Sequence, residues 1–232
     1  MSDTWLRFWD RPNAIYASDR HLRVHCARIA DDILSVLPER PGLRVLDYGC
    51  GDALDAARVA ARTERLWLYD AAPSVRGRVA AAFAGVPAIA VLDEAGLARL
   101  PDGSVDVVTV SSVIQYVERA ELPALLASFR RLLAADGVLV LADVIPPDCG
   151  VVDDVRALLT TAARHGFLAA ALASLAATLL SDYSRFRRRL GLATYDDAQI
   201  RAVLGDAGLA AERHARNFGF NPARRTYLAR PR

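Results

Sequence analysis

The sequence predicts an α/β fold: a doubly wound, mostly parallel sheet of seven strands with an antiparallel pair at its edge. Three observations predict it. Short apolar stretches alternate with amphipathic stretches from residue 43 to residue 145, which is typical of buried parallel strands joined by crossover helices. Two strand-like stretches near the C-terminus are joined by a short connection, which favours antiparallel pairing. The first strand ends in a glycine-rich turn, where open sheets of this kind bind ligands.

The elements follow in order along the chain. Residues 1–20 are aromatic and are predicted to be irregular, and a helix is expected over about 21–37. The predicted strands cover residues 43–49, 65–70, 88–93, 105–111, 137–145, 210–218 and 224–230. Helices are expected near residues 52–62, 73–84 and 119–135, and the alanine- and leucine-rich stretch 150–190 is predicted to be helical throughout.

The composition fits one globular domain with a lid or insertion. The chain has 232 residues, of which 53% are hydrophobic and 24% charged, enough to form a packed core. A net charge of +2 gives no whole-protein reason to expect nucleic-acid binding, so the run RFRRRLG at 185–191 is interpreted as a solvated helix face. Three cysteines without CxxC spacing indicate neither a disulfide framework nor a structural zinc site, and no metal site is predicted.

Two stretches of the sequence bear on where in the cell the protein is expected. The N-terminal MSDTWLRFWDRP contains acids and tryptophans but no apolar signal core, so we expect a cytoplasmic protein. The longest apolar run, GFLAAALASLAATLL at 166–180, has 15 residues and is too short to span a bilayer. No transmembrane segment is predicted, whereas peripheral contact with a membrane stays open.

The glycine turn lies in VLDYGCGDALDAARVA, residues 45–60. The dinucleotide pattern GxGxxG fails, because Gly49 and Gly51 fit but the third position is Leu54, and the phosphate loop GxxxxGK[ST] is absent. Asp47 and Asp52 flank the turn and would repel a pyrophosphate. They suit a cation without phosphate, such as S-adenosylmethionine with its sulfonium and ammonium groups.

These residues resemble the class I S-adenosylmethionine-dependent methyltransferases. Asp47, Gly49 and Gly51 match the family pattern [DE]xGxGxG, with Ala53 in place of the third glycine, and LYD supplies the acid at the end of the next strand. LPDGSVDVVTVSSVIQYV and FRRLLAADGVLVLADV resemble the family's fourth-strand and fifth-strand segments. The resemblance covers about 44–146, and 192–230 more loosely. It implies a Rossmann-like fold, S-adenosylmethionine as the cofactor and a small-molecule acceptor.

The resemblance also implies roles for single residues. The backbone of Gly49, Cys50 and Gly51 would line the methionine portion of the cofactor, and Asp47 would help to orient its ammonium. Asp70 would accept the ribose hydroxyls, with Ala71 beside the adenine. Further cofactor candidates are Tyr16 in a lid, Asp93 after the third strand, and Ser111 and Ser112 after the fourth. The alternatives are helix capping for Asp52 and Asp70, and core or capping duty for the two serines.

A methyl group on a sulfonium is already activated, so the family fixes no catalytic residue and placement dominates. Four side chains are candidates for a general base toward the acceptor. His21 and His25 lie four apart on one face of the first helix, His165 begins the apolar run and Asp143 lies near the end of the fifth strand. For each, a packing or surface role is the alternative.

The chain divides into four parts under this interpretation. Residues 1–40 form a cap or lid, 41–149 the cofactor-binding core, 150–191 a helical insertion, and 192–232 a closing helix with the strand pair. Pro146 and Pro147 end the fifth strand, so the insertion is expected over the carboxyl edge of the sheet. It would be an acceptor lid, a homodimer interface or a membrane-facing surface.

The expected reaction is methyl transfer to a small, apolar or lipid-like acceptor, with O-, N- and C-methylation all open. Two alternatives stay open. One is an NAD-type oxidoreductase of the dinucleotide fold, and the other is a non-catalytic protein that binds a cofactor or a partner.

Overall fold

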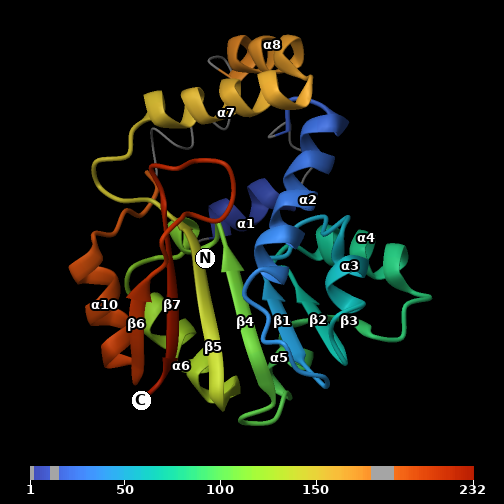
Figure 1. Cartoon of the computed structure of the whole chain (residues 1–232), viewed down its shortest axis with the longest axis vertical. Helices are drawn as coiled ribbons and strands as arrows, with labels where there is room; N and C mark the ends of the chain where they lie inside the picture. Colours follow the sequence, from blue (N-terminus) through green and yellow to red (C-terminus); the bar gives the residue numbers. More distant parts are fainter. Residues whose placement is uncertain (1–2, 11–15, 179–190) are drawn as a thin grey trace.

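The computed structural model describes residues 3–10, 16–178 and 191–232 (Figure 1). The run 185–190 and the end of the apolar stretch therefore lie outside the described residues. The strands are β1 (Arg44–Tyr48), β2 (Arg65–Tyr69), β3 (Ile89–Leu92), β4 (Val105–Ser111), β5 (Leu133–Val144), β6 (Leu209–Arg213) and β7 (Arg225–Pro231). The helices are α1 (Asp3–Trp9), α2 (Asp19–Leu34), α3 (Ala56–Ala60), α4 (Pro73–Phe83), α5 (Glu94–Ala98), α6 (Leu122–Leu132), α7 (Val151–His165), α8 (Leu168–Thr178) and α10 (Asp197–Asp206), with a 3-10 turn η1 (Ile114–Tyr116).

The seven strands form one sheet in the order β3-β2-β1-β4-β5-β7-β6. Strands β1 to β5 pair in parallel, whereas β7 runs antiparallel between β5 and β6. The predicted α/β fold with its antiparallel pair is therefore confirmed. The chain order reverses between β1 and β4, so their carboxyl ends form the crevice in which ligands bind in open sheets.

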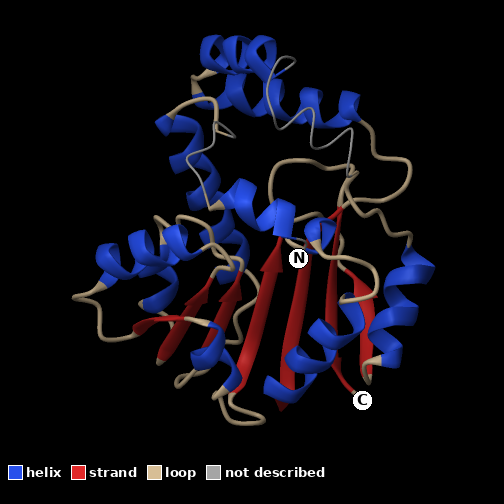
Figure 2. Cartoon of the chain, turned by 180° about the vertical axis from the view of Figure 1, so that it is seen from behind, coloured by secondary structure: helices blue, strands red, loops and turns tan. Residues whose placement is uncertain are grey.

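Helices cover both faces of the sheet (Figure 2). One core lies between the sheet and the helices α5, α6 and α10, and the other lies between the sheet and α2, α3 and α4. Strand β4 shows why the sheet is so apolar, since its first six residues are all buried. A strand packed on both faces buries apolar side chains on each of them, and the two polar residues buried in β4, Asp106 and Thr109, are both hydrogen-bonded.

The structure corrects several predicted elements. Helix α1 occupies part of the stretch predicted to be irregular, because buried Trp5 packs 4.7 Å from the ring of Tyr116. Helix α5 was not predicted, and the helix expected over 52–62 is only α3. Strand β6 ends at Arg213 rather than at residue 218, because the following loop turns away to bind α2 and β5.

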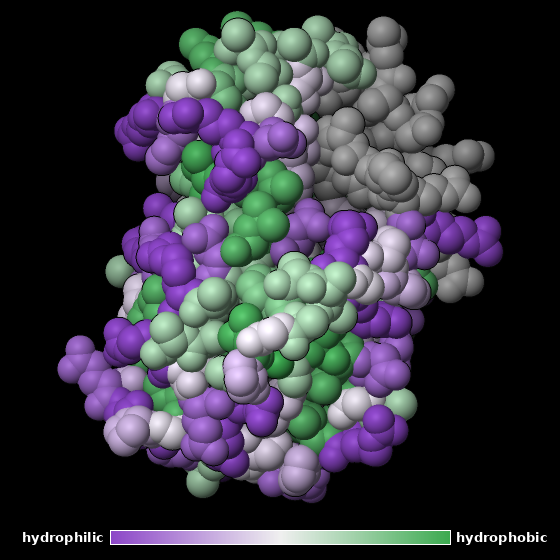
Figure 3. Space-filling model, turned by 90° about the vertical axis from the view of Figure 1, so that its right-hand side faces the viewer, coloured by the Kyte–Doolittle hydropathy of each residue, from purple (hydrophilic) through white to green (hydrophobic). Residues whose placement is uncertain are grey.

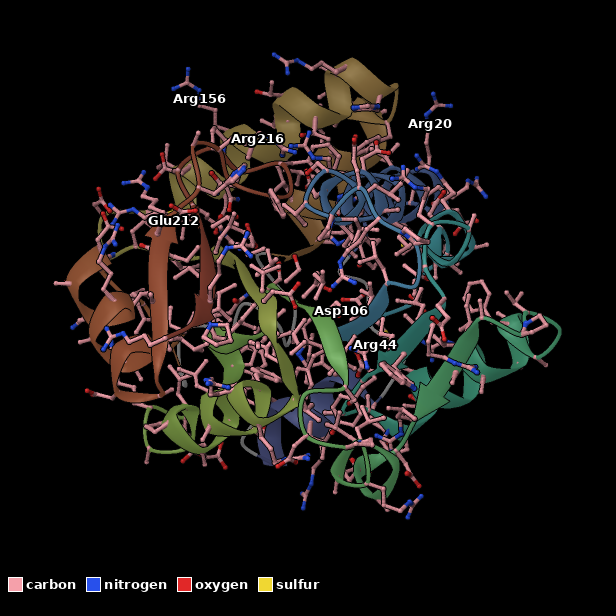
Figure 4. All side chains as sticks on the ribbon, turned by 60° about the horizontal axis from the view of Figure 1, so that its bottom comes forward. Arg20, Arg44, Asp106, Arg156, Glu212 and Arg216 are labelled. Carbon is pink, nitrogen blue, oxygen red and sulfur yellow. The ribbon has the colours of Figure 1, made fainter. Side chains whose placement is uncertain are left out.

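The β6–β7 loop fastens the carboxyl edge of the sheet to α2. The carboxylate of Asp32 on α2 is 1% exposed. It accepts hydrogen bonds from Arg28, from Arg216 at 2.6 Å and from the backbone N–H of Gly219 at 2.6 Å. Figure 4 labels Arg216, which belongs to this loop. A buried carboxylate is tolerated only when it is paired in this way, so the loop and α2 hold each other in place.

Helices α7 and α8 lie above the carboxyl ends of the strands, next to the end of α2 (Figure 1). The ring of His21 on α2 stacks 4.8 Å from Phe167, which packs with Ala162 and Ala171. The outer side of α8 is apolar and exposed at Leu168 and Leu172 (Figure 3). Among the described residues, no helix combines the length and the apolar content needed to cross a bilayer.

Candidate cofactor and acceptor site

A cavity of about 630 Å³ opens at the carboxyl ends of β1, β2 and β4. Its walls come from α1, α2, the β1–α3 turn, α4 and the segment after β4. It therefore sits where the chain order of the sheet reverses, and the predicted glycine turn forms part of its wall. Ten predicted site residues line it: Tyr16, His25, Asp47, Gly49, Cys50, Gly51, Asp70, Ala71, Ser111 and Ser112.

The structure favours glycine at positions 49 and 51 of the turn for two different reasons. The backbone N–H groups of Gly49 and Cys50 both donate to the carbonyl of Tyr69, at 2.7 and 3.0 Å. A Cβ on Gly49, at φ +80°, would lie 2.3 Å from Cγ2 of Val113, so Gly49 permits close packing against the segment after β4. A Cβ on Gly51, at φ +56°, would meet nothing within 4 Å. Gly51 is therefore the glycine that leaves free space beside the turn.

Asp70 links the turn to the end of β2. Its Oδ2 accepts the N–H of Gly51 at 3.1 Å and its Oδ1 accepts the N–H of Ala72 at 2.9 Å. The alternative role as the N-cap of α4 is wrong, because that cap is Ala72. Burial raises the pKa of Asp70. Each carboxylate oxygen keeps a second lone pair for a ligand hydroxyl.

Asp47 is buried in the floor of the cavity. Its Oδ1 accepts the hydroxyl of Thr109 at 2.9 Å. Burial raises its pKa to about 6, although that hydrogen bond acts in the opposite direction. A cation placed in the cavity would reverse the shift, because an opposite charge favours the ionised carboxylate.

The lining of the cavity is strongly acidic. Five carboxylates contribute to it: Asp47, Asp52, Asp55, Asp70 and Glu121. The cation in the same lining, Arg78, is paired with Asp52 at 2.8 Å. Asp52 therefore does not cap a helix as the alternative held, since α3 begins after Asp55. Such a cavity suits a cationic ligand and disfavours a pyrophosphate.

The four candidate general bases lie in different parts of the structure. His25 lines the cavity, with its ring 5.4 Å from the ring of Tyr16, and burial lowers its pKa. His21 stacks on Phe167 and accepts the N–H of Ala17, with a pKa lowered by burial to about 4. His165 is exposed at the end of α7. Of these histidines, only His25 reaches the cavity.

Asp143 is engaged by other side chains and lies outside the cavity lining. Its carboxylate accepts hydrogen bonds from Ser112, Asn217 and Arg224. These three donors occupy both carboxylate oxygens within the protein, away from the residues that line the cavity. The structure therefore does not support Asp143 as a general base.

Asp93 also lies away from the cavity lining. Its Oδ1 accepts the N–H of Gly96 at 2.7 Å, which makes it the N-cap of α5. This cap explains an acid at the end of β3 without a ligand. The described residues of the insertion, in α7 and α8, contribute nothing to the cavity lining either, so the expected acceptor-lid role has no support from this cavity.

The sequence prediction assigned no wall residue to α1 or α6, which contribute Trp9 and Leu125. Trp9 and Tyr116 form an aromatic wall, with their rings 5.4 Å apart, and Val113 and Leu125 extend it. The tryptophans in MSDTWLRFWDRP were a visible signal, because aromatic side chains commonly line small-molecule pockets. The position of Leu125 on α6 gave no comparable signal.

Comparisons with known proteins give the family. A family model described as a methyltransferase domain matches residues 16–214. Nocamycin O-methyltransferase of Saccharothrix syringae is 33% identical over 161 residues, which cover 62% of this chain and 57% of that relative. The chain therefore matches little more than half the length of this curated relative.

Solved structures share the fold. Magnesium protoporphyrin IX methyltransferase from Synechocystis PCC 6803, with bound S-adenosylhomocysteine, matches with a TM-score of 0.59 and 21% identity, over 99% of this chain and 94% of that one. The DhpI complex with S-adenosylhomocysteine matches with a TM-score of 0.61 and 14% identity, over 97% and 94%. The family match favours the predicted methyltransferase over an NAD-type oxidoreductase. The chain belongs to the methyltransferase-domain family, as its motifs predicted.

Proposed function

We propose that this protein transfers a methyl group from S-adenosylmethionine to a small, largely apolar acceptor in the cavity at the ends of β1 and β4. The observation that carries the proposal is the acidic cavity around the glycine turn, with Asp47 and Asp70 in its wall and free space beside Gly51. This arrangement fits a ligand that carries positive charge and a ribose but no phosphate.

The residues assigned to the cofactor are those of the turn and its neighbours. Asp70, fixed by the N–H groups of Gly51 and Ala72, would accept the ribose hydroxyls. Asp47 would face the cationic amino-acid portion, and Ala71 would lie at the adenine. Tyr16, Cys50, Ser111 and Ser112 complete this part of the wall. Cys50 is assigned no chemistry, because burial raises the pKa of its thiol.

The acceptor portion of the cavity is proposed to lie along the aromatic wall. Trp9, Tyr16 and Tyr116 supply rings, and Val113 and Leu125 supply aliphatic surface. Aromatic and aliphatic walls with few polar groups bind small apolar molecules. The relative that acts on nocamycin supports a small-molecule acceptor and O-methylation as the first reaction to test.

The chemistry requires placement more than a special catalytic group. S-adenosylmethionine supplies an activated methyl group when bound. Holding two reactants in line contributes roughly 7–11 kcal/mol. His25 is the proposed base for an acceptor that must lose a proton, because it lines the cavity and burial holds its imidazole neutral.

The test is calorimetry on the full chain with S-adenosylmethionine, S-adenosylhomocysteine and NAD. We expect binding of both sulfur ligands and none of NAD. NAD binding at micromolar affinity without binding of S-adenosylmethionine would contradict the proposal. Methyl transfer from labelled S-adenosylmethionine to a panel of phenols, alcohols and amines then tests the acceptor class.

A further inference from the structure

Ser112 joins the wall of the cavity to a buried ion-pair cluster. Its hydroxyl donates a 2.6 Å hydrogen bond to Oδ2 of Asp143, and Ser112 itself lines the cavity. Both residues have a left-handed backbone, with φ +57° and φ +62°. The pairing of β5 with β7 shifts in register between Leu141 and Val144, next to Asp143. Non-glycine residues in this conformation are strained and concentrate at functional sites.

The carboxylate of Asp143 is fixed from its other side. Asn217 donates to Oδ1 at 3.0 Å, and Arg224 pairs with Oδ2. Arg224 also binds Asp154 of α7 at 2.8 Å. Only 8% of Asp143 is exposed. Ser112, Asn217 and Arg224 all donate to this carboxylate, so it is the acceptor in each of these hydrogen bonds.

This cluster fixes the polarity of Ser112. A serine hydroxyl has one proton and two lone pairs, and the proton is committed to Asp143 by a short, charge-assisted bond. Toward the cavity Ser112 can then only accept a hydrogen bond. A ligand that places a hydrogen-bond acceptor there would be repelled by the two lone pairs of the Ser112 hydroxyl oxygen.

We propose that Ser112 is a specificity-determining residue that selects an N–H or O–H donor on the bound ligand, with Asp143 and Arg224 as the residues that position it. The inference rests on the proposed function, because it assigns a partner to one wall of the same cavity. Two groups supply the required donor: the ammonium of the cofactor, and the hydroxyl or amine of an acceptor before methylation. An acceptor without N–H or O–H would gain nothing from Ser112.

The test uses Ser112→Gly. Glycine relieves the left-handed strain at φ +57° while it removes the hydroxyl, so we expect a folded protein, checked by thermal unfolding. Ser112→Ala is the second variant and keeps the Cβ. Ser128→Ala is the matched control, because the hydroxyl of Ser128 donates to the carbonyl of Leu125 within α6 and does not line the cavity.

The first arm measures affinity for S-adenosylhomocysteine and for 5′-methylthioadenosine, which lacks the amino-acid portion. If the donor is the ammonium, both Ser112 variants should bind S-adenosylhomocysteine about tenfold or more weakly, with unchanged affinity for 5′-methylthioadenosine. The second arm measures the affinities of phenol and of its methyl ether, anisole, for the protein saturated with S-adenosylhomocysteine. If the donor is the acceptor, the wild type should prefer phenol by about three- to tenfold, and both variants should lose that preference.

A loss in either arm supports the inference and identifies the source of the donor. Unchanged affinity for S-adenosylhomocysteine together with no loss of preference for phenol overturns it. Failure of the wild type to bind S-adenosylhomocysteine is a separate result, which overturns the proposed function and this inference with it. Ser128→Ala should match the wild type in both arms.

Discussion

Thr109 donates a 2.9 Å hydrogen bond from Oγ1 to Oδ1 of Asp47, its direct partner on the neighbouring strand. The bond holds a carboxylate that is only 6% exposed. The effect of burial on the pKa outweighs that of the hydrogen bond, so the pKa of Asp47 rises to about 6 from an ordinary value of 3.8. Asp47 is therefore a negative group whose charge is lost within the mildly acidic range.

Affinity for S-adenosylmethionine should fall as the pH drops below about 6. The cation favours ionised Asp47, so binding releases a proton wherever Asp47 is protonated in the free protein. Affinity should change by up to about tenfold per pH unit below 6 and stay level above it. Calorimetry across pH 5 to 8 measures this, and Asp47→Asn should bind weakly with little pH dependence. A wild-type affinity that is level down to pH 5 would contradict the assignment.

The same residue should lower the stability of the free protein at neutral pH. Because the pKa of Asp47 is raised on folding, its contribution to the free energy of unfolding is most favourable below pH 3.8. That contribution is lost as the pH rises through about 6. The buried charge then costs about 3 kcal/mol. Asp47→Asn should therefore unfold with a higher free energy than the wild type at pH 7.5, while it binds the cofactor poorly. Chemical denaturation at pH 7.5 and pH 4 measures the difference.

Gly49→Ala and Gly51→Ala should have different effects. The Cβ at residue 49 would lie 2.3 Å from a methyl group of Val113, so we expect lost stability of about 1–3 kcal/mol from overpacking, with further strain at φ +80°. The Cβ at residue 51 meets open space, so strain of about 1–2 kcal/mol is expected, with a large loss of affinity for S-adenosylhomocysteine. Denaturation and calorimetry separate the two. Full affinity in Gly51→Ala would show that the cofactor does not occupy this space.

Asp70→Ala and Asp93→Ala form a matched pair of acids at the ends of adjacent strands. Loss of the Asp70 carboxylate should weaken S-adenosylhomocysteine binding by roughly 1.5–3 kcal/mol, the scale of a hydrogen bond to a charged group. Loss of Asp93 removes the N-cap of α5 and should reduce stability by about 1 kcal/mol without changing affinity. Equal affinities for the two variants would sink the assignment of Asp70 to the ribose.

The sequence predicted the part of the site that short stretches of chain build. Asp47, Gly49 and Gly51 lie within five residues of one strand and its turn, and Asp70 ends the neighbouring strand. Parallel strands bring their carboxyl ends together, so these residues lie close together regardless of the conformation of the connecting loops. Short helices such as α1 and α5 were missed because five to seven residues hold too little periodicity.

The other side of the site depends on contacts distant in sequence. Arg224 and Asn217 reach Asp143 from 81 and 74 residues away, through an irregular loop that no periodic pattern predicts. The spacing of His21 and His25 put both on one helix face, but it could not say which of them lies beside the cavity. Tertiary packing decides that question, since Phe167 covers His21.

Arg224→Met should be far more destabilising than Arg131→Met. Arg224 is buried between Asp143 and Asp154, and its removal leaves two carboxylates with fewer donors, which costs about 3–5 kcal/mol in buried pairs. Arg131 pairs with exposed Asp102, an interaction of less than about 1 kcal/mol. Denaturation curves measure both. A loss below 1 kcal/mol for Arg224→Met would show that the cluster does not hold α7 to the sheet.

Phe167→Ala should loosen α7 and α8 without changing cofactor affinity. Phe167 is buried among Ala162, Ala171 and Val24 and stacks on His21, and loss of a buried phenylalanine costs about 3–5 kcal/mol. Hydrogen exchange should therefore rise along both helices. Affinity for S-adenosylhomocysteine should stay the same, because no described residue of either helix lines the cavity. Leu172→Ala, at an exposed position, is the control and should change neither readout. Reduced affinity in Phe167→Ala would instead show that these helices act on the cavity through α2, and would restore the lid role expected for them.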